Sequence, residues 1–150
     1  MPERTPIPYP NLRVRALIVS GGHLLLARLH TRPVVFFPGG RVESDESLVD
    51  ASAREVKEEC GAIADRIEYL GAVENIWSEN GRRIHHFFLV ESAALGPSAT
   101  PHCQDQRVEL YWVPFGRAKH EPIKPESVKR LLCGWLDGQR NVWWAYESEA

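Results

Sequence analysis

The chain has 150 residues and a formal net charge of −2, with 43% apolar and 25% charged residues. These values are typical of a globular domain that can bury a core, and they exclude a basic surface for duplex nucleic acid or an anionic membrane. Three cysteines, odd in number and far apart, favour neither a disulfide framework nor a zinc site and fit a cytoplasmic location. No run of about 18 apolar residues predicts a membrane span.

The first third of the chain predicts an extended lead-in followed by strands. Residues 1–11 contain four prolines and no apolar signal segment, so we interpret them as a lead-in to a single domain over residues 12–150. Residues 12–20 and 23–29 are aliphatic and flank Gly21-Gly22, which predicts a hairpin. Residues 33–38 predict a short strand that leads into a loop at Gly39-Gly40.

The rest of the chain adds helices and further strands, and the whole predicts an α/β fold with helices packed on a mixed sheet. The expected elements are a helix over 46–60 closed by Gly61, strands over 64–75 and 82–92 joined by a loop over 75–81, a long loop over 93–106, a strand over 108–115 and a helix over 124–138. Residues 141–146 predict either a last strand or a tail. Their aromatic cluster, Trp143, Trp144 and Tyr146, fits core closure, a homodimer contact or a lid over a base.

Three glutamates in the 46–60 helix call for an explanation. On a helical wheel, Glu55, Glu58 and Glu59 gather along one border of the apolar stripe. Like charges at these spacings repel each other, and the repulsion grows where the dielectric constant is low. A hard dication such as Mg²⁺ or Mn²⁺ would turn three repelling carboxylates into a ligand set. The helix alone, however, also fits an ordinary solvated charged surface.

The wider spacing favours the metal interpretation, because the segment resembles the Nudix box. That pattern is a glycine, five residues, a glutamate, seven residues, and then Arg-Glu-apolar-x-Glu-Glu-x-Gly-apolar. The matching positions here are Gly40, Glu46, Arg54, Glu55, Val56, Glu58, Glu59, Gly61 and Ala62. Ala62 is smaller than the usual Ile, Leu or Val, which weakens packing without touching the chemistry.

The resemblance implies an α/β/α sandwich with a mixed central sheet and a set of site residues. Glu55, Glu58 and Glu59, with the backbone carbonyl of Gly40, would bind Mg²⁺ or Mn²⁺, and Arg54 would orient the carboxylates. Glu55 and Glu58, assisted by Arg54, would then be the catalytic residues. In some members of the family the general base is instead an acidic residue on a later loop. Candidates for that role are Asp105 and Glu109, for which a surface role also remains open.

Residues outside the box must select the substrate. Arg28, with Arg13, Arg15 and Arg32, carries a fork suited to phosphate oxygens, although a strand-end arginine is also often solvated. The Gly39-Gly40 pair would let the backbone approach a phosphate closely. Trp77, placed in a loop, could stack on a base or could anchor that loop.

The resemblance implies Mg²⁺- or Mn²⁺-dependent hydrolysis of a diphosphate linkage in a nucleoside diphosphate linked to another group X. We expect the substrate to be a nucleoside di- or triphosphate. The expected partner is therefore a small phosphorylated metabolite, without duplex nucleic acid or membrane, and a homodimer remains open. Alternatives are a non-catalytic nucleotide-binding sensor and a hydrolase of sugar nucleotides or ADP-ribose.

Overall fold

The computed structural model describes residues 11–78 and 81–148. The predicted lead-in therefore lies outside the described residues, apart from Asn11, with which the first strand begins. The elements run in chain order as β1 (Asn11–Ser20), β2 (His23–Leu29), β3 (Val35–Phe36), β4 (Gly39–Arg41), α1 (Leu48–Cys60), β5 (Arg66–Ser78), β6 (Gly81–Glu91), β7 (Val108–Pro114), α2 (Phe115–Ala118), α3 (Glu126–Leu136) and β8 (Trp143–Ser148).

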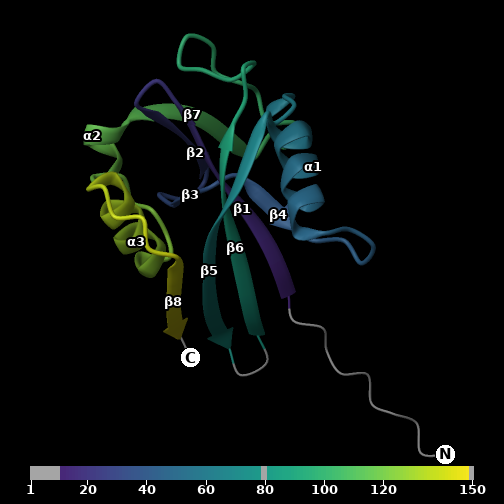
Figure 1. Ribbon diagram of the computed structural model, residues 1–150, viewed down its shortest axis with the longest axis vertical. Helices are drawn as coiled ribbons and strands as arrows, with labels where there is room; N and C mark the ends of the chain where they lie inside the picture. The colour runs from purple at the N-terminus through teal and green to yellow at the C-terminus, as the bar shows by residue number, and fades with distance from the viewer. Residues whose placement is uncertain (1–10, 79–80, 149–150) are drawn as a thin grey trace, which may run out of the picture.

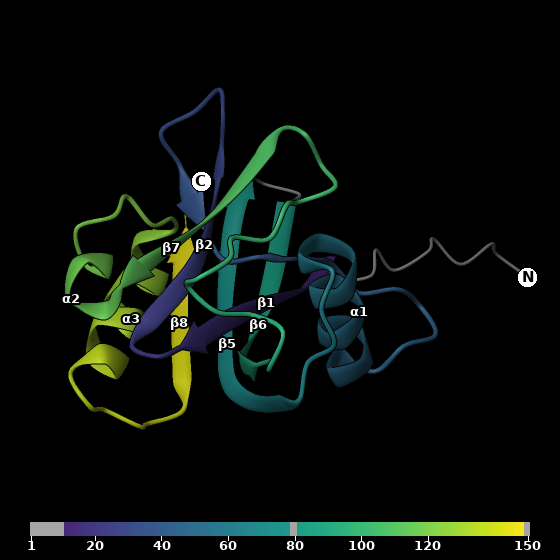
Figure 2. The ribbon, with the colours of Figure 1, turned by 90° about the horizontal axis from the view of Figure 1, so that it is seen from above.

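The strands form one mixed sheet, which confirms the predicted fold class. Its order is β3-β2-β1-β6-β5-β8, with β4 paired to β1 and β7 paired to β2. The β1–β6 and β5–β8 pairs are parallel, and the other pairs are antiparallel. Helix α1 covers one face, while α2 and α3 lie on the other side (Figures 1 and 2).

Each face of the sheet has its own apolar core, because strand side chains alternate between faces. Val14, Ile18 and Phe88 pack with Val56 of α1 on one face. On the other face the core is formed by strand residues of the opposite parity together with α3, and it includes Leu17, Phe87, Leu132, Trp135 and Trp143.

Several element boundaries differ from the sequence-based expectations. Helix α1 begins at Leu48 rather than at residue 46, because the Ser47 side chain accepts a hydrogen bond from the Asp50 amide at 3.0 Å and caps the first turn. The helix ends as predicted, with Gly61 in the left-handed conformation at φ 67°. Helix α3 likewise starts two residues later than predicted, at Glu126 after Pro125.

The predicted loop at Gly39-Gly40 is instead a short strand, β4, because it finds a partner in β1. Gly39 lies opposite Arg15 and Gly40 opposite Val14. A second correction concerns the hairpin after residue 75, where β5 continues to Ser78 and β6 begins at Gly81. Trp77 is therefore on a strand rather than in a loop. The short helix α2 was not predicted and takes up Phe115, the last residue of the expected strand 108–115.

Strand β8 settles the open question about residues 141–146 for most of that segment. It pairs in parallel with β5, and Trp143 is buried against Phe87 with ring centroids 5.3 Å apart. Trp144 and Tyr146 alternate with it and are exposed. Among the described residues, no helix has the length and apolarity needed to cross a bilayer.

The β5–β8 junction requires a glycine, which gives a test of the fold. At Gly71, φ is +144° and an added Cβ would collide with the backbone of Trp143. We expect Gly71→Ala to lower the free energy of unfolding by at least about 1–3 kcal/mol, through backbone strain and separation of β8. Chemical denaturation monitored by fluorescence measures this. Gly116→Ala is the control, since nothing lies within 4 Å of its added Cβ. Equal stability of Gly71→Ala and wild type would contradict the described junction.

Candidate active site

Glu55 and Glu59 are more buried than the wheel predicted. The buried residues of α1 are Ala51, Ser52, Val56 and Cys60. Ala51 extends the buried stripe across the side that carries the glutamates, so Glu55 and Glu59 lie within the stripe rather than along its border. Glu58 stays at the edge, with 56% of its side chain exposed against 13% for Glu55.

Strand β4 passes directly over these two carboxylates. The Gly39 amide donates a hydrogen bond to Oε2 of Glu59 at 3.0 Å. A Cβ on Gly40 would lie 2.5 Å from Oε1 of Glu55, so any other residue here would displace that carboxylate. Gly39 is constrained from the other side, because its added Cβ would strike the carbonyl of Val14 on β1. The two glycines thus let a strand backbone, α1 and β1 approach one another at one point.

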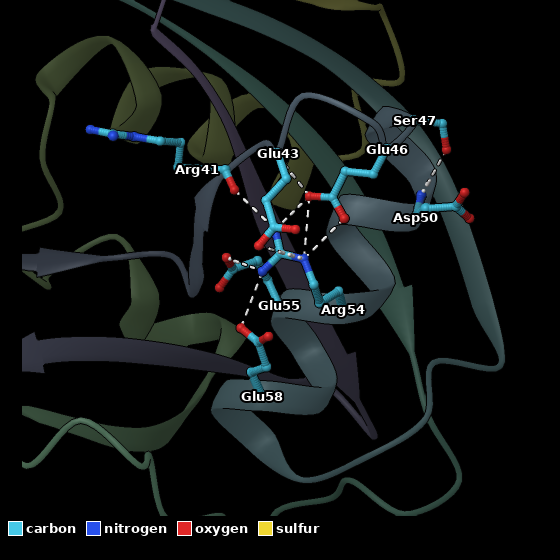
Figure 3. Close-up of polar contacts among 8 residues, drawn as sticks. All are labelled: Arg41, Glu43, Glu46, Ser47, Asp50, Arg54, Glu55 and Glu58. Carbon is cyan, nitrogen blue, oxygen red and sulfur yellow. Dashed lines mark hydrogen bonds and ion pairs between the residues drawn. The ribbon is translucent and has the colours of Figure 1, made fainter.

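Arg54 connects the box residues (Figure 3). Its Nε donates to Oε2 of Glu46 at 2.9 Å, and its Nη2 donates to the carbonyl of Arg41 at 3.0 Å. Its Nη1 bridges Glu55 at 2.9 Å and Glu58 at 3.1 Å. One planar guanidinium therefore fixes the loop before α1 and two carboxylates of α1 in a single geometry.

The carboxylates of α1 are not fully compensated. Burial, followed by the charge of Glu55, raises the pKa of Glu59 to about 7. Burial also raises the pKa of Glu55, against the opposing effect of its hydrogen bond from Arg54. By contrast, the hydrogen bond from Arg54 lowers the pKa of Glu46. The fold therefore holds Glu55 and Glu59 where their negative charges are disfavoured, unless a cation joins them.

The donor set suits a hard divalent cation. Carboxylate oxygens of Glu55 and Glu59 lie beside the backbone of β4, and Nη1 of Arg54 joins the Glu58 carboxylate to that of Glu55. Within the described residues, no three acidic, imidazole or thiol groups already stand in ligating geometry. Arg54 bridges Glu55 and Glu58, so a bound cation would have to replace part of that bridge. The residues fit Mg²⁺ or Mn²⁺ by chemistry and charge.

The predicted phosphate-binding residue Arg28 and the candidate bases Asp105 and Glu109 each form an ion pair apart from the α1 carboxylates. Arg28 faces Glu109 across β2 and β7 in a two-pronged contact at 3.0 and 2.9 Å, and both side chains are more than 40% exposed. Asp105 is held by Arg107 at 2.9 Å, and that contact lowers the pKa of Asp105 to about 2. A carboxylate with so low a pKa is a poor proton acceptor at neutral pH.

Trp77 lies at a cavity on the face of the sheet opposite α1. The guanidinium carbon of Arg83 lies 4.3 Å from the centre of the indole ring. Arg15 and Asn75 line the same cavity. Sequence reasoning had not singled out Arg83. The alternation of β6 could have identified it, since Arg83, His85 and Phe87 must share one face of a strand.

Comparisons with known proteins agree with this geometry. The NUDIX domain model matches residues 10–131 of the chain. An 8-oxo-dGDP phosphatase, NUDT18, from Danio rerio is 28% identical over 108 residues, which cover 72% of this chain and 31% of that protein. The chain thus spans about a third of the length of this curated relative.

Solved structures share the fold. A mutator MutT protein from Bacillus halodurans superposes with a TM-score of 0.75 at 18% identity, covering 91% of this chain and 89% of the other. A NUDIX hydrolase from Nitrosomonas europaea superposes with a TM-score of 0.69 at 21% identity, covering 89% of this chain and 93% of the other. The ORF135 protein of E. coli gives 0.62 at 27% identity, covering 85% and 89%.

The family match spans most of the chain and includes the glutamates, the arginine and the glycines whose contacts are described above. The chain belongs to the NUDIX domain family.

Proposed function

We propose that the protein hydrolyses a diphosphate linkage in a nucleoside diphosphate linked to another group X, with a nucleoside di- or triphosphate as substrate. One observation carries the proposal: the two carboxylates Glu55 and Glu59 are held half-buried against β4, where burial raises the pKa of both. A solvated structural helix has no need of that arrangement. A site that must attract a dication, and with it a pyrophosphate, does need it.

In this proposal Glu55, Glu58, Glu59 and the Gly40 carbonyl hold Mg²⁺ or Mn²⁺. When bound, the cation neutralises charge on the diphosphate and lowers the pKa of a coordinated water. Arg54 keeps Glu46 in place through Nε and Glu55 through Nη1, while its contact with Glu58 would give way to the cation. Arg54 is thus a positioning residue, because its hydrogen bonds go to the chain itself.

Glu55 is the proposed proton acceptor. Its raised pKa makes it a stronger base than an ordinary surface glutamate at neutral pH. Water oxygen bonds to phosphorus, the water proton passes to the Glu55 carboxylate, and the bridging oxygen leaves on the second phosphate. Asp105 and Glu109 are weaker candidates, because Arg107 and Arg28 hold them as low-pKa carboxylates.

A substrate panel tests the proposal directly. Nucleoside di- and triphosphates, ADP-ribose and a sugar nucleotide are each incubated with Mg²⁺ or Mn²⁺, and phosphate and pyrophosphate release is measured. We expect release from the nucleoside di- and triphosphates that EDTA abolishes. Binding of these compounds without release of either product would instead favour a non-catalytic sensor, and preferential cleavage of ADP-ribose or the sugar nucleotide would reassign the substrate.

Glu58 gives the sharpest mutational test of catalysis. Glu58→Gln removes one proposed metal ligand from a mostly exposed position, so we expect kcat/KM to fall by about 10²-fold or more while the chain stays folded. Steady-state kinetics and thermal denaturation measure the two effects. Asp50→Asn is the matched control on the same helix, since Asp50 lies apart from the Arg54 contacts (Figure 3). Near-normal turnover of Glu58→Gln would count against the assignment.

Because the pKa of Glu59 is raised, we expect the stability of the protein to change with pH in opposite directions with and without metal. Its folded pKa of about 7 lies above the ordinary value of 4.5. The folded state therefore holds the proton more tightly than the unfolded state does. In EDTA, this group makes the protein most stable at low pH, and that contribution is lost as pH rises through about 4.5 to 7. With Mg²⁺ or Mn²⁺ in excess, binding requires the ionised form, so added stability should appear as pH rises towards 7.

Thermal denaturation between pH 4.5 and 8, with EDTA or with Mn²⁺, measures both trends. Glu59→Gln supplies the control, because an uncharged amide should flatten both of them. Parallel pH curves for wild type and Glu59→Gln, with and without metal, would refute this account of Glu59.

A further inference from the structure

The cavity beside Trp77 combines aromatic walls with a cationic lining. It has a volume of about 380 Å³ and reaches Phe37, two residues before the β4 strand that contacts the α1 carboxylates. Its cations are Arg15, Arg32, Arg83 and Lys124, of which Lys124 is paired with Glu126 at 2.6 Å. Over the described part of the chain, no carboxylate lines it.

Arg83, which lines this cavity, carries one donor that the described part of the fold leaves unpaired. Its Nε is buried and has no hydrogen-bond partner among the described residues, and the same is true of Oδ1 of Asn75, its cross-strand neighbour. The indole of Trp77 covers the guanidinium at 4.3 Å, and Gly81 leaves room for that ring, since an added Cβ there would strike it. Trp77 and Gly81 thus position a guanidinium whose Nε has no hydrogen-bond partner among the described residues.

Arg15 connects this cavity to the box. Its Nη1 donates to the Phe37 carbonyl at 3.1 Å, and its Nε lies 3.5 Å from Nδ1 of His85. Burial, together with the charges of Arg13 and Arg83, lowers the pKa of Arg15 to about 10, while Glu59 acts in the opposite direction. Burial, followed by the charge of Arg15, lowers the pKa of His85 to about 3, so this imidazole is neutral.

We propose that this cavity binds an anionic group of the substrate. That group is separate from the diphosphate that would bind to the cation held by the α1 carboxylates. This inference rests on the proposed function and narrows its substrate class to compounds in which X carries phosphate, such as nucleoside triphosphates. ADP-ribose and sugar nucleotides, whose X is a neutral sugar, are poor matches. An anion beside Arg15 and Arg83 would relieve the repulsion that Arg15 experiences from Arg83 and Arg13, and its oxygens would accept hydrogen bonds from guanidinium groups that line the cavity. A neutral sugar supplies acceptors only and leaves that repulsion in place.

A binding experiment without metal tests the cavity independently of catalysis. Inorganic tripolyphosphate is titrated into the protein in EDTA, and calorimetry and thermal shift follow binding. We expect Arg83→Gln to weaken tripolyphosphate binding about tenfold or more, which is the size expected for a charge-assisted hydrogen bond, and Arg83→Lys to restore part of it. Arg82→Gln is the control, because the Arg82 side chain is exposed, does not line the cavity and has its Nη1 3.5 Å from Oε2 of Glu74. Equal affinity in Arg83→Gln and wild type overturns the proposal.

Kinetics then separate this inference from the proposed function. For an active enzyme, we expect Arg83→Gln to raise KM about tenfold for a nucleoside triphosphate and to leave KM for ADP-ribose with the same base unchanged. An equal loss on both compounds would mean that the cavity reads the base or the ribose, and would overturn the inference while hydrolysis stands. Failure of the wild type to cleave any compound would contradict the proposed function, and tripolyphosphate binding would still decide the role of Arg83.

Discussion

The arrangement of the site depends on one constraint: two carboxylates of α1 are held in its buried stripe, under a short strand that begins with two glycines. Gly40 leaves the space for Glu55, and the Gly39 amide contacts Glu59. Neither contact compensates the burial of the charge fully, since the pKa of both glutamates is raised. The stability of the two apolar cores thus offsets the cost of burying these acidic groups at a place where a dication is favoured.

The sheet separates the charges of this region. The carboxylates come from α1 on one face, whereas Arg15 and Arg83 belong to the opposite face with His85 and Phe87. Strand β4 lies between them, and Arg15 is close enough for Glu59 to affect its pKa. A polyphosphate bound at β4 would meet a cation held by carboxylates on one side and guanidinium groups on the other. The proposed diphosphate site and the proposed anion-binding cavity therefore both depend on the position of β4.

The sequence predicts the box and its helix well, because local spacing determines them. Gly61 ends α1 where the sequence predicts, and the Arg54 pairs lie within one loop and two helical turns, although the Ser47 cap moves the start of the helix from residue 46 to Leu48. The mixed sheet follows from strand and helix periodicity. The Arg28–Glu109 pair, by contrast, joins residues 81 apart and requires β2 to pair with β7, a pairing that no local pattern shows. For the same reason β4 was taken for a loop, since its partner β1 lies more than 20 residues earlier in the chain.

The burial of Glu55 and Glu59 could not be predicted either, because it depends on how β4 crosses α1 and not on the helix alone.

The most direct test is a crystal structure of the protein soaked with Mn²⁺, with the ion located by its anomalous scattering. We expect Mn²⁺ to bind the carboxylates of Glu55, Glu58 and Glu59 and the Gly40 carbonyl, and the distance between Nη1 of Arg54 and the Glu58 carboxylate to increase. An ion bound elsewhere, or an Arg54 bridge left intact with no ion between these carboxylates at saturating Mn²⁺, would contradict it.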